Sequence, residues 1–312
     1  MKLGASAWPF RWNPPFDPVI DRVAALGLSA IELITWTHEM LREHYGPADV
    51  DRLRGRAASR GLEISEFVAT CEDLTSPDPS ARAAALAFFG DAVSVARDLG
   101  TGIINSVAPY PFAIRVPTMA SLEATQDNPS PYPPGLDWRG NWAICVESFA
   151  RCTELVERAG LRWAIEPHPH RYVASAASME RLLDHVPSPA LGLNLDVSHL
   201  GAMAEDAVGY IGRMPERIFH LHVSDNDGRV NRHFRPGRGK VDWDGVFGAL
   251  RVAGFDGVMS IELEDGPGAA PLPSPKDPPG RNEDATEEHD TEVRRSIAFL
   301  TQVAARHEGT FS

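Results

Sequence analysis

Four short apolar runs each end on a residue type that binds divalent cations, and they follow one another along the chain. The runs "RWAIE", "LGLNLD", "IFHLH" and "GVMSIE" deliver, in order, Glu166, Asp196, His222 and Glu262. Carboxylate oxygens combined with imidazole nitrogen suit a divalent cation. If the runs are successive strands whose ends meet, these side chains predict one metal site.

Further candidate residues lie beside these four. Side chains two residues apart on a strand point to the same side of it. His220 therefore points to the same side as His222, and His168 points to the same side as Glu166. Glu264 competes with Glu262 on the same grounds. His170 is expected on the rim of the site.

The elements that must position these side chains alternate along the sequence. Short, nearly continuous apolar runs are typical of parallel strands that are covered on both sides. They are separated by longer amphipathic patterns, and eight runs are present: 2–10, 30–36, 63–72, 102–109, 162–169, 191–199, 218–226 and 257–265.

The segments between the runs carry helix signals. Glycines at Gly27, Gly100, Gly160 and Gly254 follow helical patterns and predict their C-terminal ends, and Ser80 is expected to cap the helix that follows Pro79. Eightfold strand–helix alternation predicts an α/β protein, a (β/α)8 TIM barrel spanning residues 1–312 as a single domain.

Two connections are too long to be simple loops. Residues 109–141 are rich in proline and contain Trp138, and we interpret them as a lid or a wall of the substrate pocket; a stiff surface loop or an oligomer contact is the alternative. Residues 265–284 are rich in proline and glycine, and are either a flap or disordered. Both follow strands, on the face where such barrels place their active sites.

Composition excludes several classes of protein. A net charge of −13 argues against a nucleic-acid partner, and no apolar stretch approaches the ~20 residues that span a bilayer. The start of the chain has no features of a secretion signal. Cys145 and Cys152 share one face of a predicted helix and are interpreted, with Cys71, as thiols rather than disulfides. A cytoplasmic location is expected.

The sequence also resembles a known family. The segments "WAIEPHPH", "NLDVSHL", "FHLHVSDNDG", "PGRGKVDW" and "SIELED" together resemble the sugar phosphate isomerase/epimerase family of xylose isomerase-like TIM barrels. The most distinctive part is His-x-His-x-x-Asp followed by Pro-Gly-x-Gly-x-x-x-Trp. The resemblance covers essentially the whole chain, most specifically residues 162–265.

The resemblance implies one divalent cation, most often Mn²⁺, with Mg²⁺, Co²⁺ or Zn²⁺ also used. Its ligands would be Glu166, Asp196, His222 and Glu262, which leaves His220 deeper in the core. Glu166 and Glu262 would also act as the acid/base pair that moves a proton next to a carbonyl, through a metal-stabilised enediolate. His199 would polarise the substrate. A homo-oligomer is common in the family, and a small partner subunit is possible.

Candidate substrate contacts are less sharply defined. His168 could touch the substrate or orient a ligand, and Trp8, with Trp36, could form an apolar wall. Glu32 either faces the cavity or makes a hydrogen bond inside the barrel. One departure from the family is a longer loop after the seventh run, in which the substrate-holding arginine has several candidates: Arg229, Arg232 (the residue we favour), Arg235 and Arg238, with His233 as a competitor.

Two functions remain open at this point. The first is a metal-dependent isomerase or epimerase acting on a ketose or keto-polyol. The second is a lyase or dehydratase that uses the same enediolate for β-elimination, similar to inosose dehydratases or to enzymes that cleave 3-keto C-glycosides. An abasic-site endonuclease would need more zinc-binding histidines and a basic surface. A non-catalytic binding module would have little reason to retain every expected ligand.

Overall fold

A computed structural model describes all residues except 115–131, 273–281, 308 and 312. In the described part of the chain, eight parallel strands pair in sequence order and close into a barrel, with β8 pairing to β1. The predicted (β/α)8 barrel is therefore confirmed. The strands are β1 Lys2–Ser6, β2 Ala30–Thr35, β3 Glu63–Ala69, β4 Ile103–Val107, β5 Arg162–Glu166, β6 Leu191–Asp196, β7 Ile218–Val223 and β8 Val258–Ile261.

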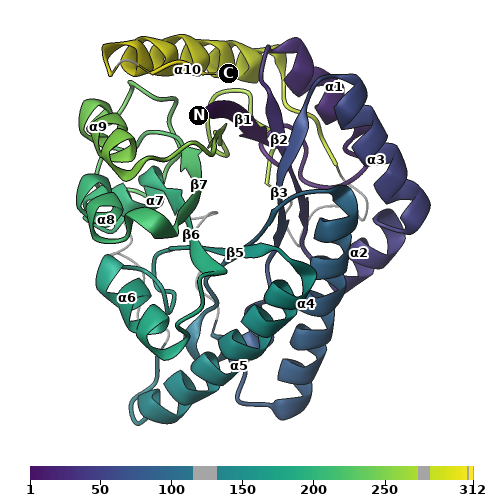
Figure 1. Cartoon of the computed structure of the whole chain (residues 1–312), viewed down its shortest axis with the longest axis vertical. Helices are drawn as coiled ribbons and strands as arrows, with labels where there is room; N and C mark the ends of the chain where they lie inside the picture. The colour runs from purple at the N-terminus through teal and green to yellow at the C-terminus, as the bar shows by residue number, and fades with distance from the viewer. Residues whose placement is uncertain (115–131, 273–281, 308, 312) are drawn as a thin grey trace.

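Helices surround the barrel, as Figure 1 shows. They are α1 Asp17–Ala25, α2 His38–His44, α3 Pro47–Ser59, α4 Pro79–Leu99, α5 Trp138–Ala159, α6 Ala176–His185, α7 Val197–Ala202, α8 Ala207–Arg213, α9 Trp243–Ala253 and α10 Glu287–Arg306. Short 3-10 turns lie at Glu72–Thr75, Pro111–Ala113 and Pro215–Arg217. The last helix, α10, closes the ring beside α1, where Arg22 donates to Asp290.

Most predicted helix ends are confirmed. Gly100, Gly160 and Gly254 adopt positive φ at the C-caps of α4, α5 and α9. The expected Ser80 cap is wrong: Asp78 is the N-cap of α4, and its carboxylate accepts from the Ser80 amide. Pro79 occupies the first helical turn, where its missing N–H costs nothing, so the cap falls on the residue before it.

The barrel interior is divided into layers by side-chain type. Toward the N-terminal end, the ring of Phe219 packs with Ile103 and Ala164. A Cβ on Gly192 would lie 2.5 Å from this ring, so glycine is what lets Phe219 fill the interior. Above it lies a fully buried polar layer, where branched aliphatic residues are usual in such barrels. Its members are Ser6, Glu32, Glu66, Asn105, Asn194, His220 and Ser260.

The two long connections are only partly described. Residues 109–141 begin with a 3-10 turn and end inside α5, which starts at Trp138; the predicted lid or wall itself falls largely on 115–131, outside the described residues. The end of 265–284 is attached to the β1–α1 loop, where Asn282 donates to the Asn13 carbonyl and Arg11 pairs with Asp284. The remainder of that loop, 273–281, lies outside the described part.

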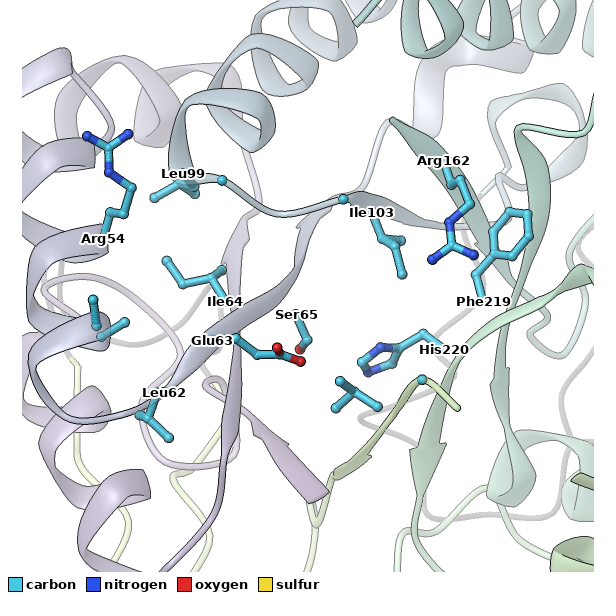
Figure 2. A pocket seen from close by; sticks show the side chains of 16 residues that line it. Arg54, Leu62, Glu63, Ile64, Ser65, Leu99, Ile103, Arg162, Phe219 and His220 are labelled. Carbon is cyan, nitrogen blue, oxygen red and sulfur yellow. The ribbon is translucent and has the colours of Figure 1, made fainter. Parts of the chain in front are cut away.

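A cavity of about 440 Å³ opens at the N-terminal end of the barrel. Figure 2 shows Arg162, Phe219 and His220 on one side of it and Glu63 and Ile64 on the other. Because its lining comes from the first residues of the strands, it lies at the end opposite the predicted metal ligands.

The expectation that the cysteines are thiols is also confirmed. Cys71, Cys145 and Cys152 are buried free thiols. None of the helices in the described ranges is long and apolar enough to cross a membrane.

Candidate metal centre

The four predicted metal ligands meet at the C-terminal end of the barrel. Their candidate ligand atoms all lie within 4.8 Å of one another, and every side chain is buried. His222 lies at the centre, with its Nδ1 atom 2.9 Å from Glu166 Oε1 and 3.1 Å from Glu262 Oε2. The convergence predicted from the strand ends is therefore present.

Strand register brings these residues together. Glu166 and Asp196 are the last residues of β5 and β6, and Glu262 directly follows β8. Asp196 pairs in register with His222. Asp196 is also the N-cap of α7: its Oδ1 accepts from the amides of Ser198 and His199, which leaves Oδ2 for the cluster.

The cluster fits a divalent cation. Asp196 Oδ2 and Glu262 Oε2 are buried and have no hydrogen-bond partner among the described residues, although buried polar atoms normally have one. Neighbouring ligands of an octahedral cation with bonds near 2.1 Å lie about 3 Å apart, and the two distances from His222 match this spacing. Glu166, Asp196, His222 and Glu262 would hold the ion.

Electrostatics separate the two glutamates. Burial disfavours the ionised form of Glu166, but the imidazoles of His222 and His168 outweigh it and lower its pKa. Burial raises the pKa of Glu262, and the nearby carboxylate of Glu264 adds to the rise. For His222, burial opposes protonation, but the surrounding carboxylates, Glu262 first, raise its pKa well above the usual value. Without a cation, the imidazolium supplies the positive charge that the carboxylates require.

Three further histidines adjoin the cluster. His168 stacks on His199 with ring centroids 3.6 Å apart, and their Nε2 atoms lie 3.7 and 3.8 Å from Glu166 Oε1. His199 Nδ1 donates to Asn231 Oδ1 at 2.7 Å. Burial, with the neighbouring imidazoles of His168 and His233, lowers the pKa of His199 to about 3. The predicted residues His168 and His199 therefore both lie beside the candidate ligand group.

His233 was named from the sequence only as a competitor of the loop arginines for contact with the substrate. Its Nε2 lies 3.3 Å from Asp196 Oδ2, and the side chain is buried. The favoured alternative, Arg232, makes only backbone hydrogen bonds among the described contacts, to Val230 and Asn226. Its contact with substrate stays a prediction. The sequence signal was only that a histidine lay among the arginines of this loop.

Asp225, the last residue of the His-x-His-x-x-Asp motif, determines where His233 lies. Its carboxylate accepts from the amides of Gly237 and Val241 and from the indole of Trp243. Its backbone forms an isolated antiparallel bridge with Phe234, the residue after His233. The motif thus folds the long loop back over β6 and β7.

Beneath the cluster, Glu32 binds both histidines of β7. Its Oε2 accepts from His222 Nε2 at 2.9 Å, and its Oε1 lies 2.6 Å from His220 Nε2. Glu32 is fully buried, so of its two expected roles the structure shows the hydrogen bond inside the barrel. Glu66, 3.7 Å from His222 Nε2, completes this layer; no motif in the sequence singled it out.

The remaining predicted residues surround this arrangement. The ring of Trp8 meets His222 edge-on at 5.6 Å and Trp36 at 6.5 Å, which places an apolar wall beside the centre. Glu264 lies 3.9 Å from His233 Nδ1 and outside the group of four ligands. His170 is partly exposed and has a φ of 65°.

Comparison with known proteins places the chain among sugar-modifying relatives. It is 25% identical to D-psicose 3-epimerase of Agrobacterium fabrum over 267 residues, which is 82% of each protein. It is 27% identical to fructoselysine 3-epimerase of Escherichia coli O157:H7 over 125 residues, 39% of this chain and 46% of the relative. It is 24% identical to inosose dehydratase of Geobacillus thermodenitrificans over 146 residues, 41% of this chain and 49% of the relative. The last two matches thus span about half the length of those relatives.

The fold is shared with solved structures and with a family profile. D-psicose 3-epimerase from Clostridium cellulolyticum H10, solved with D-tagatose, superposes with a TM-score of 0.73 at 21% identity, covering 97% of this chain and 99% of the other. The profile described as "Xylose isomerase-like TIM barrel" matches residues 20–306. The chain therefore belongs to the family of xylose isomerase-like TIM barrels, as its sequence motifs indicated.

Proposed function

We propose that the protein is a divalent-metal-dependent sugar isomerase or epimerase acting on a ketose or keto-polyol. The observation that carries the proposal is the convergence of Glu166 and Glu262 on His222 Nδ1, at 2.9 and 3.1 Å, in one buried cluster with Asp196. The similarity to sugar 3-epimerases over most of the chain supports the substrate class. Manganese is the cation that we expect.

The bound cation would act as a Lewis acid and stabilise negative charge on substrate oxygens beside the carbonyl. Glu166 ends β5 and Glu262 follows β8, so a substrate carbon held between them would meet a different carboxylate on each face. One of the two carboxylates would accept the proton from one face of the carbon, and the other would return a proton to the opposite face. In the reverse direction the roles exchange.

The neighbouring side chains would orient the substrate. His199 and His168 lie within 4 Å of Glu166 Oε1 and are proposed to contact or polarise substrate oxygens. Trp8 would pack against the apolar face of the sugar. Contact between the substrate and Arg232 is part of the same proposal.

The second candidate function is β-elimination from the same proton-abstracted state, as in a dehydratase. The similarity to an inosose dehydratase favours it. The two candidates differ only after the proton has left: an epimerase returns it to the carbon, whereas a lyase expels a group from the next carbon.

A product screen tests the proposal. Ketoses, inososes and 3-keto-glucosides would be incubated with the protein, with Mn²⁺ or with EDTA, and products identified by NMR. Inversion or isomerisation of a ketose that requires Mn²⁺ is expected. Metal-dependent loss of water or of an aglycone would select the lyase. Conversion that is equally fast in EDTA would contradict a metal-dependent function.

A further inference from the structure

The cavity at the N-terminal end of the barrel has no part in the proposed function. Its volume of about 440 Å³ is within the range of sites that bind small organic molecules. None of the four candidate metal ligands lines it. Branched aliphatic side chains usually fill the interior of such barrels, and the N-terminal end usually serves stability. An open cavity there, lined in part by charged side chains, is therefore a candidate binding site of its own.

Arg162 places a positive charge in this cavity. Alternate side chains of a strand point to the same side, so Arg162, the first residue of β5, points into the barrel as Glu166 does. Figure 2 shows its guanidinium next to the ring of Phe219, and its Cζ atom lies 4.6 Å from the ring centroid. This cation–π contact holds the guanidinium at the wall of the cavity.

The guanidinium of Arg162 still lacks an acceptor. Its contacts in the described part of the chain are the Phe219 ring and the charge of Asp256, and no side-chain hydrogen bond or ion pair is among them. Burial lowers the pKa of Arg162, and Asp256 offsets the change only in part. A planar guanidinium that is partly desolvated and unpaired is suited to bind a carboxylate through two parallel N–H···O bonds.

The acidic residue and the second arginine of the lining are already paired. Glu63 forms an ion pair with Lys2. Arg54 forms an ion pair with Asp51 at 2.6 Å. Arg162 therefore leaves one unbalanced positive charge, which a singly charged anion would neutralise.

Most of the remaining lining is apolar. The larger apolar side chains are Leu62, Ile64, Leu99, Ile103, Phe219 and Val258. His220 lies at the inner end, where its Nε2 atom is already bonded to Glu32 and Ser260. Apolar walls gain free energy by burying an apolar part of the ligand. The lining thus favours a compound with one acidic group and a short apolar body over a bare inorganic anion or a sugar.

We propose that this cavity binds a small monocarboxylate with a branched or aromatic body, whose carboxylate pairs with Arg162. The body packs against Phe219 and the aliphatic walls, and the carboxylate balances the unpaired charge. The site goes beyond the proposed function and does not depend on it, because it lies at the opposite end of the barrel from the candidate metal ligands.

Binding of two named carboxylates tests the inference. Phenylacetate and 3-methylbutanoate would be titrated into the full-length, Mn²⁺-loaded protein by isothermal calorimetry, and into the same protein in EDTA. Saturable binding in both conditions is expected, and the neutral amides of the two acids should bind at least about tenfold more weakly. Binding that disappears in EDTA would assign the carboxylate to the metal centre and overturn the inference. No saturable binding at millimolar concentrations, or inorganic phosphate binding as tightly, would also overturn it.

Variants and methyl signals locate the bound carboxylate. Arg162→Gln should weaken phenylacetate binding at least about tenfold, whereas Arg158→Gln, at an exposed position in the last turn of α5, should bind as wild type. Equal affinity in Arg162→Gln would exclude the site. If Arg162→Gln fails to fold, the wild-type protein in EDTA decides: phenylacetate should shift the NMR methyl signals of Ile64 and Ile103 but not of Ile20 in α1, and unchanged signals at saturation would overturn the inference. These failures leave the proposed function as it stands, because that function is measured on ketoses.

Discussion

At the scale of single residues, the feature that sets the chemistry is the set of contacts around His222. Its Nδ1 faces Glu166 and Glu262, while its Nε2 donates to Glu32. A carboxylate behind a ligand imidazole fixes which nitrogen carries the proton and makes the other a better ligand. Glu32 would therefore orient His222 for a bound cation without contacting the cation itself.

Replacing Glu32 by glutamine should weaken metal binding. The amide oxygen can still accept from His222, but the charge is lost, so we expect the Kd for Mn²⁺ to rise about 10- to 100-fold. Glu66→Gln is the matched control, because it neutralises an equally buried carboxylate that lies 3.7 Å from His222 Nε2 and binds Asn105 instead. Isothermal titration of both variants measures the difference. Equal Kd values would remove the positioning role of Glu32.

Replacing Glu166 by glutamine should remove the proton acceptor. We expect the rate of proton exchange on substrate to fall at least about 100-fold. Because Glu166 also belongs to the ligand group, bound metal is measured in the same samples, and rates are compared at saturating Mn²⁺. Exchange within about tenfold of the wild-type rate at full occupancy would exclude Glu166 as the base.

At the scale of elements, the sequence predicted the strands well because buried parallel strands appear as continuous apolar runs with ligand types at their ends. It could not predict the position of His233, because that depends on the contacts of Asp225 with Gly237, Val241 and Trp243 across the loop. It likewise placed the cap of α4 on Ser80, since both Asp78 and Ser80 are residue types that cap helices. Local patterns specify elements, whereas long-range hydrogen bonds specify the loops.

The junction of β6 and β7 depends on one glycine. A Cβ on Gly192 would lie 2.5 Å from the Phe219 ring and from the carbonyl oxygen of Arg217. We expect Gly192→Ala to lower the free energy of unfolding by about 1–3 kcal/mol. Gly55→Ala, in α3 with no atom near the new Cβ, should instead be neutral or stabilising by up to about 1 kcal/mol. Urea denaturation compares the two; a Gly192→Ala protein as stable as wild type would contradict this packing.

At the scale of the whole molecule, the fold buries several titratable side chains. Because burial changes their pKa values, the stability of the fold depends on pH. His289 of α10 is buried against Phe10, with ring centroids 4.6 Å apart, and neither ring nitrogen has a partner among the described residues. Burial, with the nearby charge of Arg22, lowers its pKa to about 3. The folded protein therefore keeps His289 neutral at a pH where the unfolded chain protonates it.

Above the unfolded pKa of about 6.5, a neutral, buried His289 does not reduce the free energy of unfolding. As the pH falls from there toward 3, the unfolded chain binds a proton that the folded protein does not, and the free energy of unfolding decreases. Between pH 7 and pH 5 the loss should be about 2 kcal/mol. His289→Leu should lose less stability than wild type over that range, whereas His44→Leu, at an exposed position, should behave as wild type. Denaturation at pH 7 and pH 5 measures the free energy of unfolding of both variants and of the wild type. If His289→Leu and the wild type lost the same stability, His289 would not be the source of the pH dependence.

The central claim is that the buried ligand group at the C-terminal end of the barrel abstracts a proton next to a carbonyl only when a divalent cation is bound. Its most direct test is deuterium uptake from D₂O into ketoses, followed by NMR, for the metal-loaded protein and for the same protein in EDTA. The account predicts deuterium at the carbon beside the carbonyl with Mn²⁺ and none in EDTA. Uptake at the same rate in EDTA, or product formation with no solvent deuterium incorporated, would contradict it.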